Sequence, residues 1–411
     1  MTHRSKPEWE KTVRVLFFAN LTTATGMMAM VPFLTFFVEE LGIHEPHLRN
    51  LWAGVLVGAA PIVAALLGPI WGGLSDRFGR KVMVLRAMGA IVIFVGLMSF
   101  ATSVWTMLAL RVMQGAFSGY IPTSITFASV IAPQTVQGQV AARLQSAMPA
   151  GMVGGYLLGG FLSEAGLIRW IFPICSVLSG VAFFAVLFFT KEPEDGALSA
   201  ARGPVEIMRG IWNNAIFVLH LPNLMKLLMA LIIVRFLVST VDPSYARFVV
   251  ELGGDKQFAG IVMSVQALMV LIMMPIWGRF SDREGPSRTF VLSALGVAVA
   301  YGLQGLATSP WQLLFLRAMA GAFLSGVFPA GFAMAGRESP RDKRGAAMGI
   351  VFMAFAMAHA LGSVSGGYLL NLAGFRQLFF VIAVVVGLLS LTGFYFRRRG
   401  RGAPKNARAG S

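Results

Sequence analysis

Unbroken runs of apolar residues, separated by short polar segments, dominate this chain. Since a membrane helix needs roughly 20 apolar residues, about twelve of these runs are long enough to span a bilayer. They lie at 13–38, 51–71, 82–101, 105–129, 141–163, 167–190, 226–250, 258–277, 289–307, 311–335, 345–370 and 376–396. Apolar and polar positions do not alternate within them, which argues against a transmembrane barrel. The pattern therefore predicts an all-α membrane protein with twelve transmembrane helices.

The composition agrees with this pattern. Of the 411 residues, 56% are hydrophobic and 13% are charged, whereas about 25% are charged in soluble globular proteins. Glycine (46), Met (23) and Phe (33) are abundant, as is typical of helices that pack closely in lipid. The single cysteine, Cys175, excludes an intramolecular disulfide and a cysteine-based metal site.

The placement of the positive charges predicts the orientation. The formal net charge is +16, and Lys and Arg are concentrated in alternate loops. Twenty-five of them flank one side of the expected bilayer, and the other side has only Arg49, Arg169, Arg247, Lys256 and Arg376. Cytoplasmic loops of membrane proteins carry an excess of Lys and Arg. We therefore expect the protein in the inner membrane of the cell, with both termini in the cytoplasm. The membrane topology thus explains the net positive charge of the chain, and no nucleic-acid partner is indicated.

One polar segment divides the chain. Residues 191–222 contain charges, Gly and Pro, followed by an amphipathic stretch with Ile207, Met208, Ile211 and Trp212. This composition indicates a cytoplasmic linker with a helix that lies on the membrane surface. We therefore expect six-helix bundles at 1–190 and 223–396, and a basic cytoplasmic tail at 397–411.

The two halves repeat each other. PIWGGLSDRFG at 69–79 recurs as PIWGRFSDREG at 275–285, and TSVWTMLALRVMQGAF at 102–117 recurs as TSPWQLLFLRAMAGAF at 308–323, both 206 positions later. The Glu-Leu-Gly triplet at 40–42 recurs at 251–253, 211 positions later. Two similar six-helix bundles with a site between them are typical of transport by alternating access.

The segment GGLSDRFGRK at 72–81 resembles the loop motif between the second and third helices of the major facilitator superfamily. The resemblance extends over essentially the whole chain, and a weaker copy with two departures, Glu284 and Pro286, follows the eighth run. The resemblance implies the fold of that superfamily. It also implies that this motif holds the cytoplasmic side of the transporter closed. The alternative interpretation is that its charged residues are ordinary loop residues without this role. The residues carried over to this gate are Gly72, Asp76, Arg77, Gly79, Arg80, Asp282 and Arg283.

Two further motifs resemble the twelve-span drug:proton antiporters of that superfamily. Arg111 in RVMQG resembles a fourth-helix motif linked to proton coupling; the alternative is a structural bond to a backbone carbonyl. The glycines Gly151, Gly155, Gly159 and Gly160 resemble the fifth-helix antiporter motif, but Tyr156 occupies the place of its proline. Close helix packing through glycine is the alternative interpretation there.

Asp242 is the acidic residue that lies clearly inside a membrane run. Ionisable residues at membrane depth are costly and mark functional sites by default, so Asp242 is the expected proton carrier, with Arg235 two turns earlier on the same helix face. The alternative interpretation is that Asp242 and Pro243 only break the helix, at the water-filled entrance of the transport pathway. His359 is the second candidate, because histidine titrates nearest physiological pH. We expect the proton gradient as the energy source, with no cofactor and no metal.

The resemblance implies that the first, fourth, seventh and tenth helices line the substrate cavity. Methionine and aromatic surfaces adapt to varied apolar ligands. The candidate lining residues on these helices are Asn20, Met27, Met30, Phe33, Tyr120, Arg235, Tyr245 and Phe328.

These observations predict a transporter and not an enzyme, since the sequence has no G-x-x-x-x-G-K-[ST] nucleotide loop. Our first hypothesis is proton-coupled efflux of small amphiphilic compounds by a monomer in the bilayer. The alternative is a dedicated exporter of one endogenous organic anion, such as a carboxylate metabolite or siderophore, which Arg111 and Arg235 would favour. A third hypothesis is a nutrient importer or a receptor that has lost transport.

Overall fold

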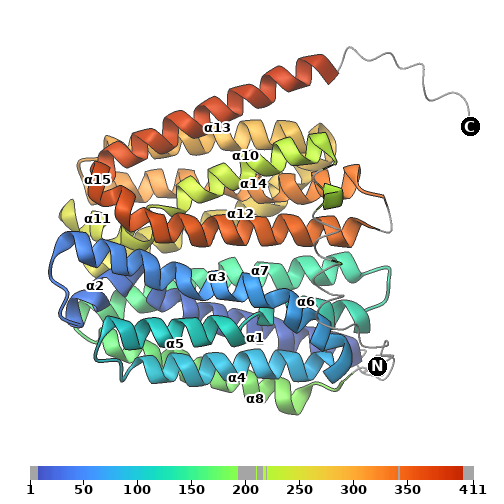
Figure 1. Ribbon diagram of the computed structural model, residues 1–411, viewed down its shortest axis with the longest axis horizontal. Helices are drawn as coiled ribbons and strands as arrows, with labels where there is room; N and C mark the ends of the chain where they lie inside the picture. The colour runs from blue at the N-terminus through green and yellow to red at the C-terminus, as the bar shows by residue number, and fades with distance from the viewer. Residues whose placement is uncertain (1–7, 193–209, 211–215, 219, 341–342, 401–411) are drawn as a thin grey trace, which may run out of the picture.

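The computed structural model describes residues 8–192, 210, 216–218, 220–340 and 343–400. These residues form helices and no strands, and most of the helices run side by side along one direction (Figure 1). In the first half the elements are α1 (Glu8–Met30), η1 (Val31–Phe33), α2 (Leu34–Glu40), α3 (Pro46–Phe78), α4 (Arg80–Met98), α5 (Val104–Phe117), α6 (Tyr120–Ile131), α7 (Gln137–Glu164), η2 (Ile168–Trp170) and α8 (Ile171–Phe189).

The second half begins with the same order of elements. Its elements are α10 (Pro222–Ser239), η3 (Asp242–Ser244), α11 (Tyr245–Glu251), α12 (Lys256–Glu284), α13 (Pro286–Gly305), α14 (Pro310–Glu338) and α15 (Arg344–Gly400). Here α14 and α15 stand where the first half has α5–α6 and α7–α8. Most of the predicted linker, including its amphipathic stretch, and the end of the basic tail lie outside the described residues.

Each of the twelve predicted runs falls on a helix, so the prediction of an all-α helical bundle is confirmed. Within the described residues, nine segments are long and apolar enough to cross a membrane. One of them, Ala347–Leu391, covers two predicted runs, because Gly374 bends α15 with a φ of 71°. The other two runs correspond to the broken pair α5 and α6 and to the glycine-rich α7.

Three of the predicted spans are interrupted. The first changes to the 3₁₀ turn η1 at Pro32, and the seventh changes to η3 at Pro243. Because proline has no backbone N–H, it cannot continue the hydrogen-bond ladder of a helix. The fourth span breaks at Gly119, which has a φ of 107°. Asp242 thus lies in a turn between two helices, where the helix-breaking Asp-Pro pair of the alternative interpretation would place it.

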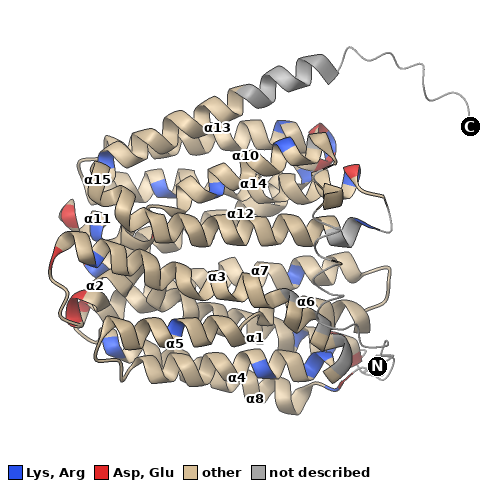
Figure 2. Ribbon diagram, in the orientation of Figure 1, with Lys and Arg blue, Asp and Glu red and all other residues tan. Residues whose placement is uncertain are grey.

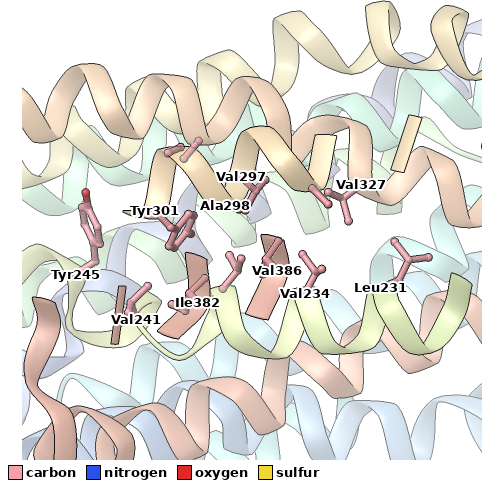
Figure 3. Close-up of a cluster of buried hydrophobic side chains, with 14 of the residues drawn as sticks. Leu231, Val234, Val241, Tyr245, Val297, Ala298, Tyr301, Val327, Ile382 and Val386 are labelled. Carbon is pink, nitrogen blue, oxygen red and sulfur yellow. The ribbon is translucent and has the colours of Figure 1, made fainter. Parts of the chain in front are cut away.

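The helices bury two hydrophobic cores. One core takes its residues from 13–186, and the other takes them mainly from 218–386, together with Phe33 and Tyr156 of the first half. Figure 3 shows part of the second core, where side chains of α10, α13, α14 and α15 meet, among them Val234, Val297 and Val386. Each half thus has an apolar centre of its own.

The internal repeat is preserved in three dimensions. Trp71 Nε1 donates a hydrogen bond of 2.7 Å to the Ala116 carbonyl, and Trp277 Nε1 donates one of 2.7 Å to the Ala322 carbonyl. All four positions obey the offset of 206. The repeated sequence blocks therefore form the same local structure twice.

The halves meet where α3 packs on α15 and α7 packs on α12. Glycines allow the close approach: a Cβ on Gly160 would lie 2.9 Å from the Lys256 carbonyl oxygen, and one on Gly367 would lie 2.1 Å from the Asn50 carbonyl oxygen. Gly160 and Gly367 are repeat-equivalent, at an offset of 207. The two seams are therefore related by the same repeat.

The molecule has two ends, which Figure 2 shows as concentrations of charged residues with few between them. We call the end that carries α2 and α11, at the left of Figure 1, the α2–α11 end. Among the described residues, the hydrogen bonds between the halves lie at this end or near the middle: Thr35–Pro243, Asn50–Asn371, His47–Asn371, Glu39–Arg247, Glu164–Lys256, Ser163–Lys256 and Val153–Ser264. In this conformation the halves are closed together at the α2–α11 end.

Candidate functional site

An ion pair within the second half is the centre of the candidate site. Arg317 Nη2 of α14 lies 3.1 Å from Asp242 Oδ1 of η3. The Arg317 side chain is 0% exposed, whereas that of Asp242 is 20% exposed. The carboxylate is thus partly exposed, while its cationic partner is enclosed.

Aromatic and amide groups complete the surroundings of Arg317. Its Nη1 donates to the Tyr301 hydroxyl at 3.1 Å, and its Cζ lies 3.8 Å from the ring centroid of Tyr245. The Tyr245 hydroxyl in turn donates to Gln304 Oε1 at 2.9 Å. A cation over an aromatic face is stabilised most when both are desolvated, as they are here. We call Asp242, Tyr245, Tyr301, Gln304 and Arg317 the Asp242 network.

Arg235 and His359 lie beside this network. Arg235 shares the seventh span with Asp242, but the hydrogen-bonded partner of Asp242 is Arg317. The Arg235 guanidinium lies 5.2 Å from the ring centroid of Phe355, and its buried Nε has no partner among the described residues. His359 Nδ1 lies 2.8 Å from Ser239 Oγ. Both predicted residues are therefore near the site without joining its ion pair.

Arg111, the predicted coupling residue of the first half, has a different environment. Its Nε donates to the Leu56 carbonyl at 2.8 Å, its Nη2 to the Val57 carbonyl at 3.3 Å and its Nη1 to Gln114 Oε1 at 2.9 Å. Pro61 has no N–H to offer the Val57 carbonyl four residues earlier. The arginine thus satisfies a helix carbonyl that the proline leaves free, which corresponds to the structural alternative stated above.

The predicted cavity residues of the first half are largely enclosed in this conformation. Asn20 and Tyr120 are buried, and Asn20 Oδ1 accepts from Ser124 Oγ at 3.0 Å. Met30 and Phe33 belong to the hydrophobic cores, and Met27 is partly exposed.

The predicted cavity residues of the second half include both buried and partly exposed side chains. Tyr245 is fully buried beneath Arg317. Phe328 is partly exposed and packs against Phe332 and Phe355, with 4.6 Å between ring centroids in both pairs. Among these candidates, Phe328 and Arg235 thus lie around one aromatic ring, Phe355. Their role as cavity residues remains a prediction.

The glycines of the antiporter-like motif serve close packing. A Cβ on Gly151, Gly155 or Gly159 would lie 2.0–2.6 Å from carbonyl oxygens of α1, and Gly160 faces α12. Tyr156, at the place of the proline, is buried and donates to Met28 Sδ at 3.8 Å. The motif therefore joins α7 to the first helix of its own half and to the other half.

The loop motif of the predicted gate is described in part. The side chains of Asp76 and Arg77 lie outside the described part of the structure, and Asp282 and Arg283 are exposed at the end of α12. Gly79 separates α3 from α4 with a φ of 95°, and a Cβ on Gly72 would meet no atom within 4 Å.

A carboxylate that the sequence analysis missed binds the same motif. Glu192 accepts hydrogen bonds from the backbone N–H groups of Arg80 at 2.6 Å and Lys81 at 2.9 Å. These groups begin α4, where the helix dipole favours an anion. The loop motif thus binds Glu192, the second residue of the predicted linker. The role of the motif as a latch remains a prediction.

A second group of charges lies at the α2–α11 end. Glu39 Oε2 is 3.4 Å from Arg49 Nη1 and 3.4 Å from Arg247 Nη1, and it connects the two halves. A cavity of about 540 Å³ lies beside it, lined among others by Glu40, Arg247 and Lys256.

The sequence analysis did not name Tyr301, Gln304 or Arg317 as candidate site residues. A signal for them was present in the repeat, because Tyr301 and Gln304 stand where the first half has the apolar residues Val95 and Met98. Polar residues that one repeat gains inside a membrane run indicate a function of that half.

Comparisons with known proteins agree with this architecture. A sequence model described as Major Facilitator Superfamily matches residues 16–249 and 227–411. The chain is 27% identical over 401 residues to the multidrug resistance protein MdtG of Dickeya zeae, covering 95% of this chain and 96% of the relative. It is 25% identical over 388 residues to the multi-drug resistance efflux pump PmrA of Streptococcus pneumoniae serotype 4, covering 93% and 95%.

A solved structure shares the fold over nearly the whole chain. It is that of a bacterial homologue of the human lysosomal transporter Spinster, in an inward-facing and unoccupied conformation. The TM-score is 0.80 at 15% sequence identity, and the match covers 96% of this chain and 98% of that one.

Proposed function

Because this chain belongs to the Major Facilitator Superfamily, we propose that it exports small amphiphilic compounds, drugs included, in exchange for protons. The relatives named multidrug resistance and efflux proteins, which match over more than nine tenths of their length, support the substrate class and the direction. The two pseudo-symmetric halves support alternating access as the mechanism.

The observation that carries the proton coupling is the Asp242–Arg317 pair. A carboxylate inside a membrane bundle, partly exposed and bound to an enclosed arginine, has two states of different charge. In the deprotonated state it pairs with Arg317, and protonation removes that attraction. Asp242 is thus the proton carrier of this proposal, and the proton gradient supplies the energy.

The orientation of the protein is part of the same proposal. The end opposite the α2–α11 end carries most of the Lys and Arg and faces the cytoplasm. The α2–α11 end lies on the outer side of the inner membrane. Both termini are then cytoplasmic, and a monomer contains the complete pathway between its two halves. The described conformation would be closed to the outside.

The experiment is substrate-induced proton movement in proteoliposomes, with a panel of lipophilic cations and carboxylate metabolites. Proton movement in response to several unrelated cations would support multidrug antiport. A response to one carboxylate alone would replace the proposal by a dedicated anion exporter. Substrate movement without protons would contradict the coupling.

A further inference from the structure

Arg235 of α10 is a cation whose donors are not used by the protein. Among the described residues its guanidinium forms no hydrogen bond and no ion pair, and its Nε is buried. The residue as a whole is partly exposed. A charge at membrane depth is costly and marks a functional site by default, with a partner to be named. Because the described residues supply no such partner, we look for it in the transported compound.

The polar neighbours of Arg235 are bonded to one another and not to its guanidinium. Ser239 Oγ donates to the Arg235 carbonyl at 2.7 Å, and His359 Nδ1 lies 2.8 Å from the same Oγ. Since the single hydroxyl proton of Ser239 is used for the carbonyl, the ring nitrogen donates to Oγ. Phe355 contributes a ring face, 5.2 Å from the guanidinium. These contacts position the guanidinium and leave its N–H donors free.

The two halves differ at this place in the seventh span. With the offset of 211, Arg235 and Asp242 stand where the first half has Ala24 and Val31. The offset holds in space, since glycines of α7 and α15 approach equivalent carbonyls of the first and the seventh span. The first half thus packs the same pair of helices with apolar side chains. The two charges are therefore not needed for packing and indicate a function of the second half.

Arg235 and Asp242 are two opposite charges at the border between the halves. They are seven positions apart on the seventh span, which is about 10 Å at the rise of an α-helix. Both act electrostatically on Tyr156 of α7, in the other half. Arg317 binds one oxygen of Asp242, but the Asp242 side chain is still 20% exposed. The border thus has a free cation and, two helical turns away, a partly exposed carboxylate.

Aromatic rings lie beside the free cation. Phe328 packs against Phe332 and Phe355, and all three side chains are partly exposed. An apolar surface with a few well-placed polar groups is typical of small-molecule sites. An aromatic compound with one acidic and one basic group would complement this combination of rings and charges.

We propose that the transporter binds zwitterionic aromatic amphiphiles, with the substrate carboxylate on Arg235 and the substrate ammonium group on Asp242. This inference rests on the proposed function and names the substrate class of the same site. Lipophilic cations bind through Asp242 alone, and more weakly, because Arg235 offers them no partner. Arg235 is thus the residue that selects the acidic group.

This assignment agrees in sign with the exchange of drug for protons. The ammonium group competes with a proton for Asp242, so the substrate is held when Asp242 is ionised and released when Asp242 takes up a proton. The substrate carboxylate lies about 10 Å from Asp242. Since Coulomb interactions weaken with distance, the loss at the ammonium group outweighs any gain at the carboxylate. A proton from outside thus displaces the substrate outward, and its release to the cytoplasm allows the next substrate to bind.

Several other groups act electrostatically on the two charges. Among the described residues they are Tyr156, Tyr245, Tyr301, Arg317 and His359. The tyrosines are neutral at physiological pH, and Arg317 is already bound to Asp242. None of these groups is a second carboxylate that could neutralise Arg235.

The test compares three probes that share a biphenyl body. The zwitterion carries a trimethylammoniomethyl group on one ring and a carboxylate on the other, both para to the bond between the rings. Its methyl ester is a permanent cation, and the biphenyl carboxylate without the ammonium group is an anion. Transport of the zwitterion and the ester is measured in proteoliposomes with a pH gradient. Proton release on binding is measured in detergent, where it comes from the protein because the quaternary ammonium group does not titrate.

In the unsubstituted protein we expect the KM of the zwitterion to be about tenfold below that of the ester, as for the gain of a charge-assisted hydrogen bond. Both probes should release protons on binding, since both carry the ammonium group. The anion should compete with the zwitterion and release no protons. Equal KM values for the zwitterion and the ester would overturn the proposal, and so would proton release by the anion.

Arg235→Gln should raise the KM of the zwitterion by about tenfold and leave that of the ester within about twofold. Arg235→Lys, which keeps the charge, should restore part of the preference. The thermal stability of Arg235→Gln should not fall, because the variant removes a charge without a partner. A loss of stability together with an equal rise of both KM values would mark Arg235 as structural and overturn the proposal.

Arg111→Gln is the matched control. Arg111 is the repeat-equivalent of Arg317 and lies inside a span like Arg235, but its donors are bonded to the carbonyls of Leu56 and Val57. Its substitution should lower thermal stability and keep the ratio of the two KM values within about twofold.

The proposal is overturned if Arg235→Gln keeps the preference for the zwitterion, or if Arg111→Gln removes it equally. If Arg235→Gln does not fold, the three probes on the unsubstituted protein still decide. The proposed function fails separately, when the unsubstituted protein couples no transport of the zwitterion, the ester or any other lipophilic cation to protons. Failure of this inference alone leaves proton-coupled transport of the cations intact.

Discussion

Gly160 of α7 and Gly260 of α12 bring the backbones of the two halves into contact. A Cβ on Gly160 would lie 3.0 Å from the Cα of Gly260, and a Cβ on Gly260 would lie 2.5 Å from the Tyr156 carbonyl oxygen. A glycine that resembles part of an antiporter motif thus belongs to the seam that must open and close during alternating access.

Gly160→Val should therefore prevent the full closure of the α2–α11 end. Overpacking costs about 1–3 kcal/mol where the neighbours can adjust, and here the neighbours are backbone atoms. We expect transport in proteoliposomes to fall by roughly tenfold while the protein still inserts in the membrane. Gly138→Ala in the same helix, where an added Cβ meets no atom within 4 Å, is the control. Normal transport by Gly160→Val would show that the seam does not need this contact.

Asp242→Asn should abolish the response of transport to a pH gradient. The substitution removes the titratable group and leaves Arg317, which is 0% exposed, without its anionic partner. Breaking a buried pair costs about 3–5 kcal/mol, and the partial exposure of Asp242 places the expected loss at the low end. Thermal unfolding in detergent measures the stability, and pH-driven drug efflux measures the coupling. Unchanged coupling in Asp242→Asn would transfer the role to His359, the second candidate.

Glu39→Gln should weaken the closure at the α2–α11 end. Glu39 pairs with Arg49 and Arg247, and the loss of its charge leaves these two cations facing each other. Because Glu39 is 40% exposed, the effect on the free energy of closure is on the order of 1 kcal/mol and decreases at high salt. Distances between spin labels on the two halves measure it. Glu251→Gln, which removes a pair within α11, is the control and should change the distances less.

Trp71→Phe and Trp277→Phe should each lower the free energy of unfolding by about 1 kcal/mol, since each removes one hydrogen bond to a helix carbonyl. Trp71 also lies 3.5 Å from the Arg86 guanidinium. A phenyl ring is a weaker cation–π partner than an indole, so Trp71→Phe should cost a few tenths of a kcal/mol more. Calorimetry in detergent compares the two variants, and the reverse order would contradict the role of Arg86.

More of the fold than of the candidate site could be predicted from the sequence. The positions of the helices follow from the length of the apolar runs, because the bilayer requires that length. The apolar run gave no indication of the break at Pro32, whereas the Asp-Pro pair indicated the break at Pro243. The pairing of Asp242 depends on Arg317, which is 75 positions away on another span, and the spacing of residues within one helix pointed instead to Arg235.

By itself, the sequence determined where the apolar helical runs lie, how the two halves repeat, and which loops carry the positive charge. These features depend on the local composition along the chain. The tertiary structure decided which of two equivalent arginines binds a carboxylate. That choice depends on how α10, α13 and α14 are rotated against one another and on whether a proline frees a carbonyl nearby. Neither property is expressed in the hydrophobic pattern, because each depends on residues of other helices that lie far away along the chain.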